Sequence, residues 1–161
     1  MHAQSSSEPV RRTTVERRGD REIVVTRWFD APPRLVFEAW SKPELFRQWW
    51  VPRSMGMTLH DCEMDVRTGG TYRLNFGEGM DFFGRYLEVV PPSRIVWTNE
   101  EGGDDASVTT VTFEEHEGRT LLIMSELFPS AEALAADGGG AAEAADETFA
   151  QLEELLAASP S

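Results

Sequence analysis

The sequence is poor in residues that bind metals or form cross-links, with one cysteine, Cys62, and three histidines. A single cysteine excludes an intramolecular disulfide and suits a reducing compartment. The cluster His60–Glu63 with Asp65 has no second cysteine or paired histidine to complete four zinc ligands, so we expect no metal. A lone buried cysteine is usually inert, which argues against Cys62 as a nucleophile. No glycine run has the spacing of a phosphate-binding loop, so we expect no cofactor.

Long hydrophobic segments are also missing. No run approaches the ~18 apolar residues that a membrane-spanning helix requires. Residues 1–20 lack the apolar centre of a secretory signal peptide. These absences predict a cytoplasmic protein that makes no membrane contact.

Basic residues are few compared with acidic ones. The chain has 15 Lys and Arg against 28 Asp and Glu, a net charge of −13. Such a surface would repel a phosphate backbone, so we expect no nucleic-acid partner. The acidic surface mainly favours solubility.

The length and the apolar content fit one folded domain. The chain has 161 residues, of which 40% are hydrophobic and 10% aromatic, enough for a substantial core. Residues 1–20 are rich in Ser, Arg and Thr and have little to bury, which predicts a disordered tail. Residues 21–158 are expected to form the single domain.

Strand-forming patterns alternate with turn signals through most of this domain. The predicted strands are Glu22–Phe29, Met57–Val66, Thr71–Phe76, Phe82–Val90, Arg94–Asn99, Ser107–Glu115 and Arg119–Leu127. Helical spacing predicts helices at Pro33–Trp40, from an N-cap at Ser41 to Pro52, at Ala131–Ala136 and at Ala141–Ala158.

This order of elements predicts an α+β fold. A sheet of six to seven antiparallel strands must bury one apolar face, and only the C-terminal helix is long enough to cover it. We therefore expect a curved sheet wrapped around that helix. The two short helices after strand 1 would close one end.

Several motifs resemble one known family. They are Pro32-Pro33 followed by Val36, Phe37 and Trp40; Trp49-Trp50; Asp65-x-Arg67-x-Gly69-Gly70-x-Tyr72-x-Leu74; Gly84-x-Tyr86 with Pro91-Pro92 and Ile95-Val96-Trp97; and Phe149-x-x-Leu152-x-x-Leu155-Leu156. On these motifs, within residues 22–157, the chain resembles bacterial proteins of the heat-shock-protein-90 ATPase activator-like group. That group belongs to the START-like (SRPBCC, Bet v-like) helix-grip superfamily. The chain departs from many members at Thr68, where proline is common, and at Ala144-Ala145-Asp146, near which a tryptophan is common.

The resemblance implies a cavity between the sheet and the C-terminal helix that takes lipids, hormones, polyketides or other apolar molecules. Strand alternation suggests which side chains face it, and places Ile95 on the same face as Trp97. A solid core filled by the same residues is the alternative that the residues themselves leave open. The candidate lining residues are Trp40, Trp50, Tyr72, Leu74, Phe76, Phe82, Tyr86, Trp97, Asn99, Phe113, Ile123, Ser125, Phe149 and Leu152.

Three functions are compatible with these features. The first is binding of a small apolar or amphipathic molecule in the cavity. The second is an enzyme of the cyclase or dehydratase kind, and the third is a module that contacts a chaperone. Neither the polar residues nor a Ser–His–acid grouping has catalytic spacing, so a non-enzyme is expected, and long sheet edges would allow a homodimer. The residues considered for chemistry are Arg73, Asn75, Arg85, Asn99, His116, Ser125 and Glu126.

Overall fold

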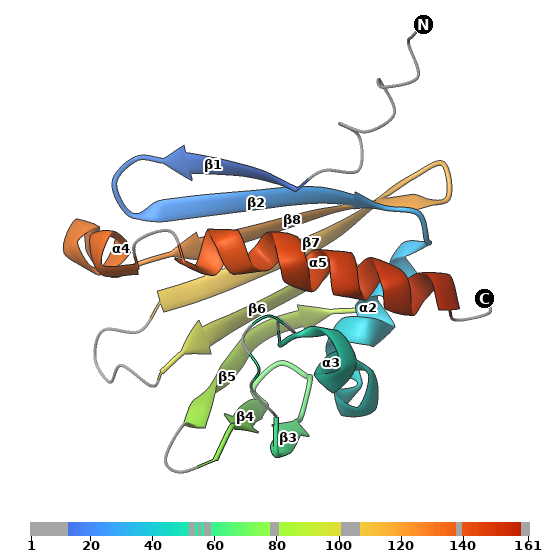
Figure 1. Ribbon diagram of the computed structural model, residues 1–161, viewed down its shortest axis with the longest axis horizontal. Helices are drawn as coiled ribbons and strands as arrows, with labels where there is room; N and C mark the ends of the chain where they lie inside the picture. Colours follow the sequence, from blue (N-terminus) through green and yellow to red (C-terminus); the bar gives the residue numbers. More distant parts are fainter. Residues whose placement is uncertain are drawn as a thin grey trace, which may run out of the picture.

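The computed structural model of the chain describes residues 13–51, 54, 56, 59–77, 81–100, 107–137 and 140–158. In this part of the chain, eight strands form one antiparallel sheet, and helix α5 lies across one face of it (Figure 1). The strands are β1 (Thr14–Arg18), β2 (Glu22–Phe29), β3 (Asp61–Met64), β4 (Thr71–Asn75), β5 (Asp81–Val90), β6 (Arg94–Asn99), β7 (Ser107–His116) and β8 (Arg119–Leu127). The helices are α2 (Pro33–Ser41), α3 (Pro43–Trp49), α4 (Ala131–Asp137) and α5 (Gly140–Ala158). The α+β fold with a C-terminal helix on a curved sheet is confirmed.

The strand order is β1-β2-β8-β7-β6-β5-β4-β3. From β3 to β8 each strand pairs with the next one along the chain, as short connections favour. The last strand then pairs with β2, so that Val25 lies opposite Met124. Helices α2 and α3 form the connection from β2 to β3; α2 contacts β7 and β8, and α3 contacts β3 (Figure 1).

Strand β1 corrects the prediction of a disordered tail over residues 1–20. Thr14–Arg18 pairs with β2 in a continuous register from Thr14 opposite Thr26 to Arg18 opposite Glu22. All five residues of β1 are exposed, and its sequence TVERR has no alternation of apolar residues that would predict a strand. The sheet consequently has eight strands rather than six to seven, and residues 1–12 lie outside the described residues.

Most predicted boundaries lie close to the observed ones, and β2, β6 and β8 have the predicted ends. The predicted strand Met57–Val66 is too long. The observed strand β3 ends at Met64 because Asp65 begins a turn, in which the Arg67 amide donates to the Asp65 carbonyl oxygen at 2.9 Å. Met57 and Thr58 lie outside the described residues.

The prediction that Ser41 caps the second helix is wrong. Ser41 is the last residue of α2, and its hydroxyl lies 3.5 Å from the Glu38 carbonyl oxygen. The N-cap of α3 is Lys42, which has an extended backbone and makes no side-chain capping bond. Pro43, whose ring restricts φ to helical values, occupies the first helical position instead.

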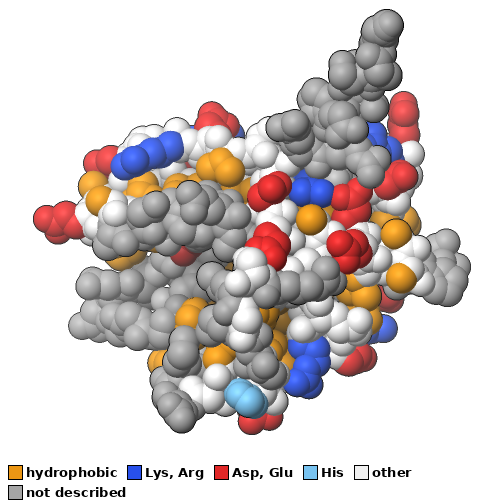
Figure 2. All heavy atoms as spheres, in the orientation of Figure 1, with side chains coloured by type: hydrophobic (Ala, Val, Ile, Leu, Met, Phe, Trp, Pro, Cys, Tyr) orange, Lys and Arg blue, Asp and Glu red, His pale blue; other side chains and the backbone are white. Residues whose placement is uncertain are grey.

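Helix α5 covers the face of the sheet that carries the main core. Phe149 and Leu152 are completely buried there, and the Phe149 ring makes an edge contact with Phe29 of β2. Acidic side chains gather over α5 in the space-filling view (Figure 2). No helix among the described residues is long and apolar enough to cross a membrane.

One cation lies under this helix. Arg27 of β2 is only 6% exposed, and its guanidinium lies 2.6 Å from the Glu153 carboxylate and 3.6 Å from that of Asp146. A buried charge requires a partner of opposite charge. Because the partners of Arg27 lie on α5, the ion pair links this helix to the sheet.

Candidate functional site

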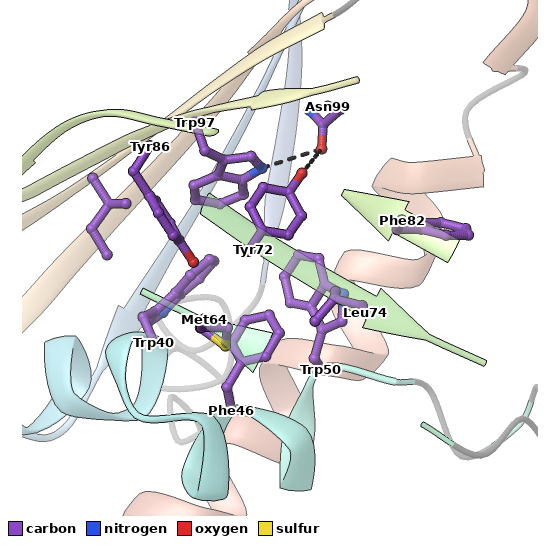
Figure 3. A pocket seen from close by; sticks show the side chains of 11 residues that line it. Trp40, Phe46, Trp50, Met64, Tyr72, Leu74, Phe82, Tyr86, Trp97 and Asn99 are labelled. Atoms are coloured by element: carbon purple, nitrogen blue, oxygen red, sulfur yellow. Dashed lines mark hydrogen bonds between the residues drawn. The ribbon is translucent and has the colours of Figure 1, made fainter. Parts of the chain in front are cut away.

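A pocket lies between helices α2 and α3 and the strands β3 to β6, and Figure 3 shows the side chains that converge on it. Seven of the lining side chains are aromatic, and none is charged. The lining residues are Trp40, Phe46, Trp50, Met64, Tyr72, Leu74, Phe82, Tyr86, Ile95, Trp97 and Asn99.

Strand alternation brings these side chains to one face. Tyr72 and Leu74 of β4 are buried, whereas Arg73 between them is exposed. On β6, Ile95, Trp97 and Asn99 face the pocket, because alternate residues of a strand lie on the same face. The alternation within each strand therefore determines which of its side chains face the pocket.

The helices supply the aromatic wall opposite the strands. Trp40 of α2 lies at the centre of this wall, with ring centroids 4.8 Å from Trp49 and 5.8 Å from both Trp50 and Trp97. The C-terminal end of α3 is held by Gln151 of α5, whose Nε2 donates to the carbonyl oxygens of Trp49 and Val51 at 2.9 Å each. These bonds satisfy carbonyl groups that a helix end leaves without partners.

Asn99 forms the polar end of the pocket. Its Oδ1 accepts from the Trp97 indole N–H at 3.2 Å and lies 3.2 Å from the Tyr72 hydroxyl, whose single proton is shared between Asn99 and the Thr98 carbonyl oxygen (Figure 3). Its Nδ2 donates to the hydroxyl oxygens of Ser107 and Thr109 at 2.9 and 3.1 Å. An amide side chain offers two acceptor and two donor positions. Asn99 therefore engages both its oxygen and its nitrogen with neighbouring side chains.

Gly84 permits a close approach beside this network. A Cβ at this position would lie 1.9 Å from the Thr98 carbonyl oxygen and 2.9 Å from Cε2 of Tyr72. The Tyr72 hydroxyl donates to that same carbonyl at 2.8 Å, and the Thr98 hydroxyl accepts from the Arg85 amide at 3.0 Å. Glycine in mid-strand thus lets β6 approach β5 and the Tyr72 ring. The register shift of β5 lies further along the strand, between Tyr86 and Glu88.

Two polar groups of the lining have no hydrogen-bond partner among the described residues. The indole Nε1 of Trp40 is fully buried and unpartnered. The Tyr86 hydroxyl makes no hydrogen bond to a described residue, and Tyr86 is only 5% exposed. Burial raises the pKa of Tyr86 well above its ordinary value, and Cys62 and Asp65 add to the rise. The phenol therefore stays protonated and neutral across the physiological range.

The pocket is small in this conformation. Its cavity volume is about 50 Å³, and a single water molecule needs roughly 10–15 Å³ of such space. Phe82 stands at its edge with 41% of its surface exposed, in contact with Phe76 at a centroid distance of 5.5 Å.

Eight of the predicted lining residues meet in this pocket, and the structure places the other six elsewhere. Phe76 is half-buried beside Phe82 and does not line the pocket. Phe113, Phe149 and Leu152 are buried in the core next to it. The residues brought together as predicted are Trp40, Trp50, Tyr72, Leu74, Phe82, Tyr86, Trp97 and Asn99.

Ile123 and Ser125 lie on the opposite face of β8, so their prediction is wrong. Leu122 is completely buried in the core, and the next residue along a strand must face the other way. Ser125 donates from its hydroxyl to the Glu22 carboxylate on that outer face. The error is one of strand phase, where a shift of one residue exchanges the faces.

Phe46 and Met64 were missed. The Phe46 ring on α3 stacks on Trp50 at a centroid distance of 4.9 Å and reaches the pocket, which the spacing of apolar residues in the helix does not show. Met64 follows Cys62 on β3 with a period of two, and this alternation could have identified it.

A second hollow, of about 610 Å³, lies over the exposed face of β4 and β5. Its arginines are paired, Arg73 with Asp81 and Arg85 with Glu100, each at 2.8 Å. Both arginines are exposed to solvent. Within the described ranges, no three His, Cys, Asp or Glu side chains gather as a metal ion would require.

Comparisons with known proteins agree with this architecture. The family model described as Activator of Hsp90 ATPase homolog 1-like protein matches residues 30–157. A crystal structure of a protein from Rhodobacter sphaeroides has 25% sequence identity and a TM-score of 0.81, and the match covers 91% of this chain and 98% of that one. A crystal structure of a protein from Mycobacterium smegmatis has 26% identity and a TM-score of 0.72, with coverage of 91% and 98%. No curated protein matches the sequence.

Proposed function

Because the chain belongs to the family of activator of Hsp90 ATPase homolog 1-like proteins, we propose that its aromatic pocket binds a small apolar or amphipathic molecule. The observation that carries the proposal is the lining itself, in which seven aromatic side chains and no charged ones surround one cavity. Ligand sites in proteins are concave and mostly apolar, with a few polar groups that orient the ligand. This pocket has that composition.

A ligand of ordinary size must widen the pocket. Sites that enclose drug-sized ligands have about 300–1,000 Å³, whereas the cavity here is about 50 Å³. Phe82 is the lining side chain that can rotate away most easily, because 41% of its surface is already exposed. Its rotation would enlarge the entrance without uncovering the core around Trp40.

The lining supports binding better than acid–base catalysis. Its only titratable side chains are those of Tyr72 and Tyr86. Tyr86 remains protonated because burial raises its pKa, so it cannot serve as a general base near neutral pH. Asn99 has all its hydrogen-bonding groups engaged. Chaperone contact draws only on the family's description, so binding is the function that we propose.

Native mass spectrometry of freshly purified protein tests the proposal. A bound molecule would add mass to the 18.1 kDa chain that disappears on denaturation. The variant Leu74→Trp places a larger ring in the pocket and should lose the added mass. Leu127→Trp makes the same substitution at an exposed position on the outer face and should keep it. The same spectra show whether the chain forms a homodimer.

The two variants also define the contrary result. Equal added mass on both variants, with unchanged circular dichroism, would place the bound molecule outside this pocket. If wild-type protein carries no added mass, it should still take up added naphthalene, and Leu74→Trp should take up less. Failure of wild-type protein to bind any apolar probe would refute the proposal.

A further inference from the structure

The polar groups of the pocket divide into two kinds. Those around Asn99 are bonded to one another, as the dashed lines in Figure 3 show. The Trp40 Nε1–H and the Tyr86 hydroxyl have no bonding partner among the described residues. Both unused groups are hydrogen-bond donors, because the indole nitrogen only donates and the phenol is protonated.

Unpartnered donors are costly in such surroundings. Trp40 is 2% exposed and its Nε1 is fully buried, so solvent does not compensate this donor. Tyr86 is 5% exposed. A buried donor left without an acceptor destabilises a protein by about as much as a hydrogen bond contributes, or more. Both residues line the pocket, and in the view of Figure 3 the Tyr86 side chain extends from β5 towards Trp40.

The lining also limits the charge of a ligand. None of the described lining residues is ionised, so an ionic ligand would lose its hydration without gaining a counter-ion. The aromatic rings favour a flat partner that can stack or make edge contacts, as the rings already do with one another.

We propose that the pocket selects neutral aromatic molecules that carry a carbonyl group, with the carbonyl oxygen accepting hydrogen bonds from Trp40 Nε1 and the Tyr86 hydroxyl. A carbonyl oxygen has two lone pairs and can accept both bonds. This inference rests on the proposed function and specifies the class of ligand for the same site.

Three probes of similar size test it on ligand-free protein. Acetophenone carries the carbonyl, ethylbenzene lacks it, and benzoate replaces it with a charge. The indole N–H signals of the five tryptophans can be followed by two-dimensional NMR after through-bond assignment. Acetophenone should move the Trp40 indole proton downfield, and ethylbenzene, which has the same ring, should not. The Trp97 indole already donates to Asn99 and serves as an internal control.

The variant Tyr86→Phe removes one donor and keeps the ring. It should weaken acetophenone binding by about fivefold and leave ethylbenzene binding within about twofold. Benzoate at pH 8 should bind at least about a hundredfold more weakly than acetophenone.

The outcomes separate this inference from the function on which it rests. If ethylbenzene binds but acetophenone neither shifts the Trp40 proton nor responds to Tyr86→Phe, the carbonyl inference is overturned and the binding function stands. Benzoate binding as tight as that of acetophenone would overturn the inference in the same way. If neither neutral probe binds, both proposals fail.

Discussion

Replacing Gly84 with alanine tests how closely β5, β6 and Tyr72 pack beside the pocket. The added Cβ would lie 1.9 Å from the Thr98 carbonyl oxygen, where ordinary contacts begin at 3.4 Å. The strands would have to separate by about 1.5 Å at this point. No positive φ is involved at Gly84, so the effect comes from contact and not from backbone conformation.

The expected loss follows from what this separation breaks. Overpacking a close contact destabilises by about 1–3 kcal/mol, and each lost hydrogen bond adds about 1 kcal/mol. The bonds at risk run from the Tyr72 hydroxyl and the Arg85 amide to Thr98. Together these effects predict a loss of about 3 kcal/mol in the free energy of unfolding, a fall of roughly 10 °C in Tm for a chain of this size.

Urea unfolding followed by tryptophan fluorescence measures the change. Gly118→Ala is the control, because a Cβ there meets nothing within 4 Å and only its positive φ of 83° opposes the substitution. That backbone effect is about 1–2 kcal/mol. Gly84→Ala should also be non-additive with Tyr72→Phe, since both remove the same bond to Thr98. A loss below about 1 kcal/mol for Gly84→Ala, or strict additivity, would refute the reasoning.

Three further substitutions probe the polar network, the buried cation and an acidic group. Asn99→Ala should lower the free energy of unfolding by about 2–3 kcal/mol, because it removes the partners of several buried groups; thermal unfolding measures this. Glu153→Ala should destabilise by about 2 kcal/mol and Arg27→Met by less, since removing only the acid leaves a buried charge. The hydroxyl of Thr98 and then Arg85, which donate hydrogen bonds to the Glu100 carboxylate, hold its pKa below the ordinary value of a glutamate. Glu100 therefore stabilises the fold at neutral pH and loses this effect as the pH falls through its lowered pKa, so Glu100→Gln should destabilise more at pH 6 than at pH 3.

Each of these expectations has a contrary result. An Asn99→Ala protein as stable as wild type would show that the network is held by other contacts. If Arg27→Met proves more damaging than Glu153→Ala, the packing of the arginine stem outweighs its charge. A Glu100→Gln effect that does not change between pH 6 and pH 3 would exclude the carboxylate as its source.

Much of the fold could be predicted from local patterns. The strands Glu22–Phe29 and Arg94–Asn99 have the predicted ends, because turn or breaker residues bound runs of β-forming residues. Strand β1 could not be predicted in this way. Its residues are all exposed, and only the free edge of β2 makes them a strand.

The candidate site was predicted where alternation within one strand was enough. Tyr72 and Leu74, or Trp97 and Asn99, share a face whatever their neighbours do. The phase of β8 depends instead on its pairing with β7, where Val111 lies opposite Met124. That pairing, and not the composition of β8, directs Ile123 to the outer face.

The sequence by itself therefore determined the order of elements, the apolar face of most strands and the aromatic character of the site, because these depend on residues close together in the chain. Only the tertiary structure decided which buried side chains meet an empty volume and which fill the core. Phe149 and Trp40 are both aromatic and almost equally buried, yet only Trp40 lines the pocket. Such differences arise from contacts between distant elements, since packing and hydrogen-bond satisfaction belong to the assembled fold.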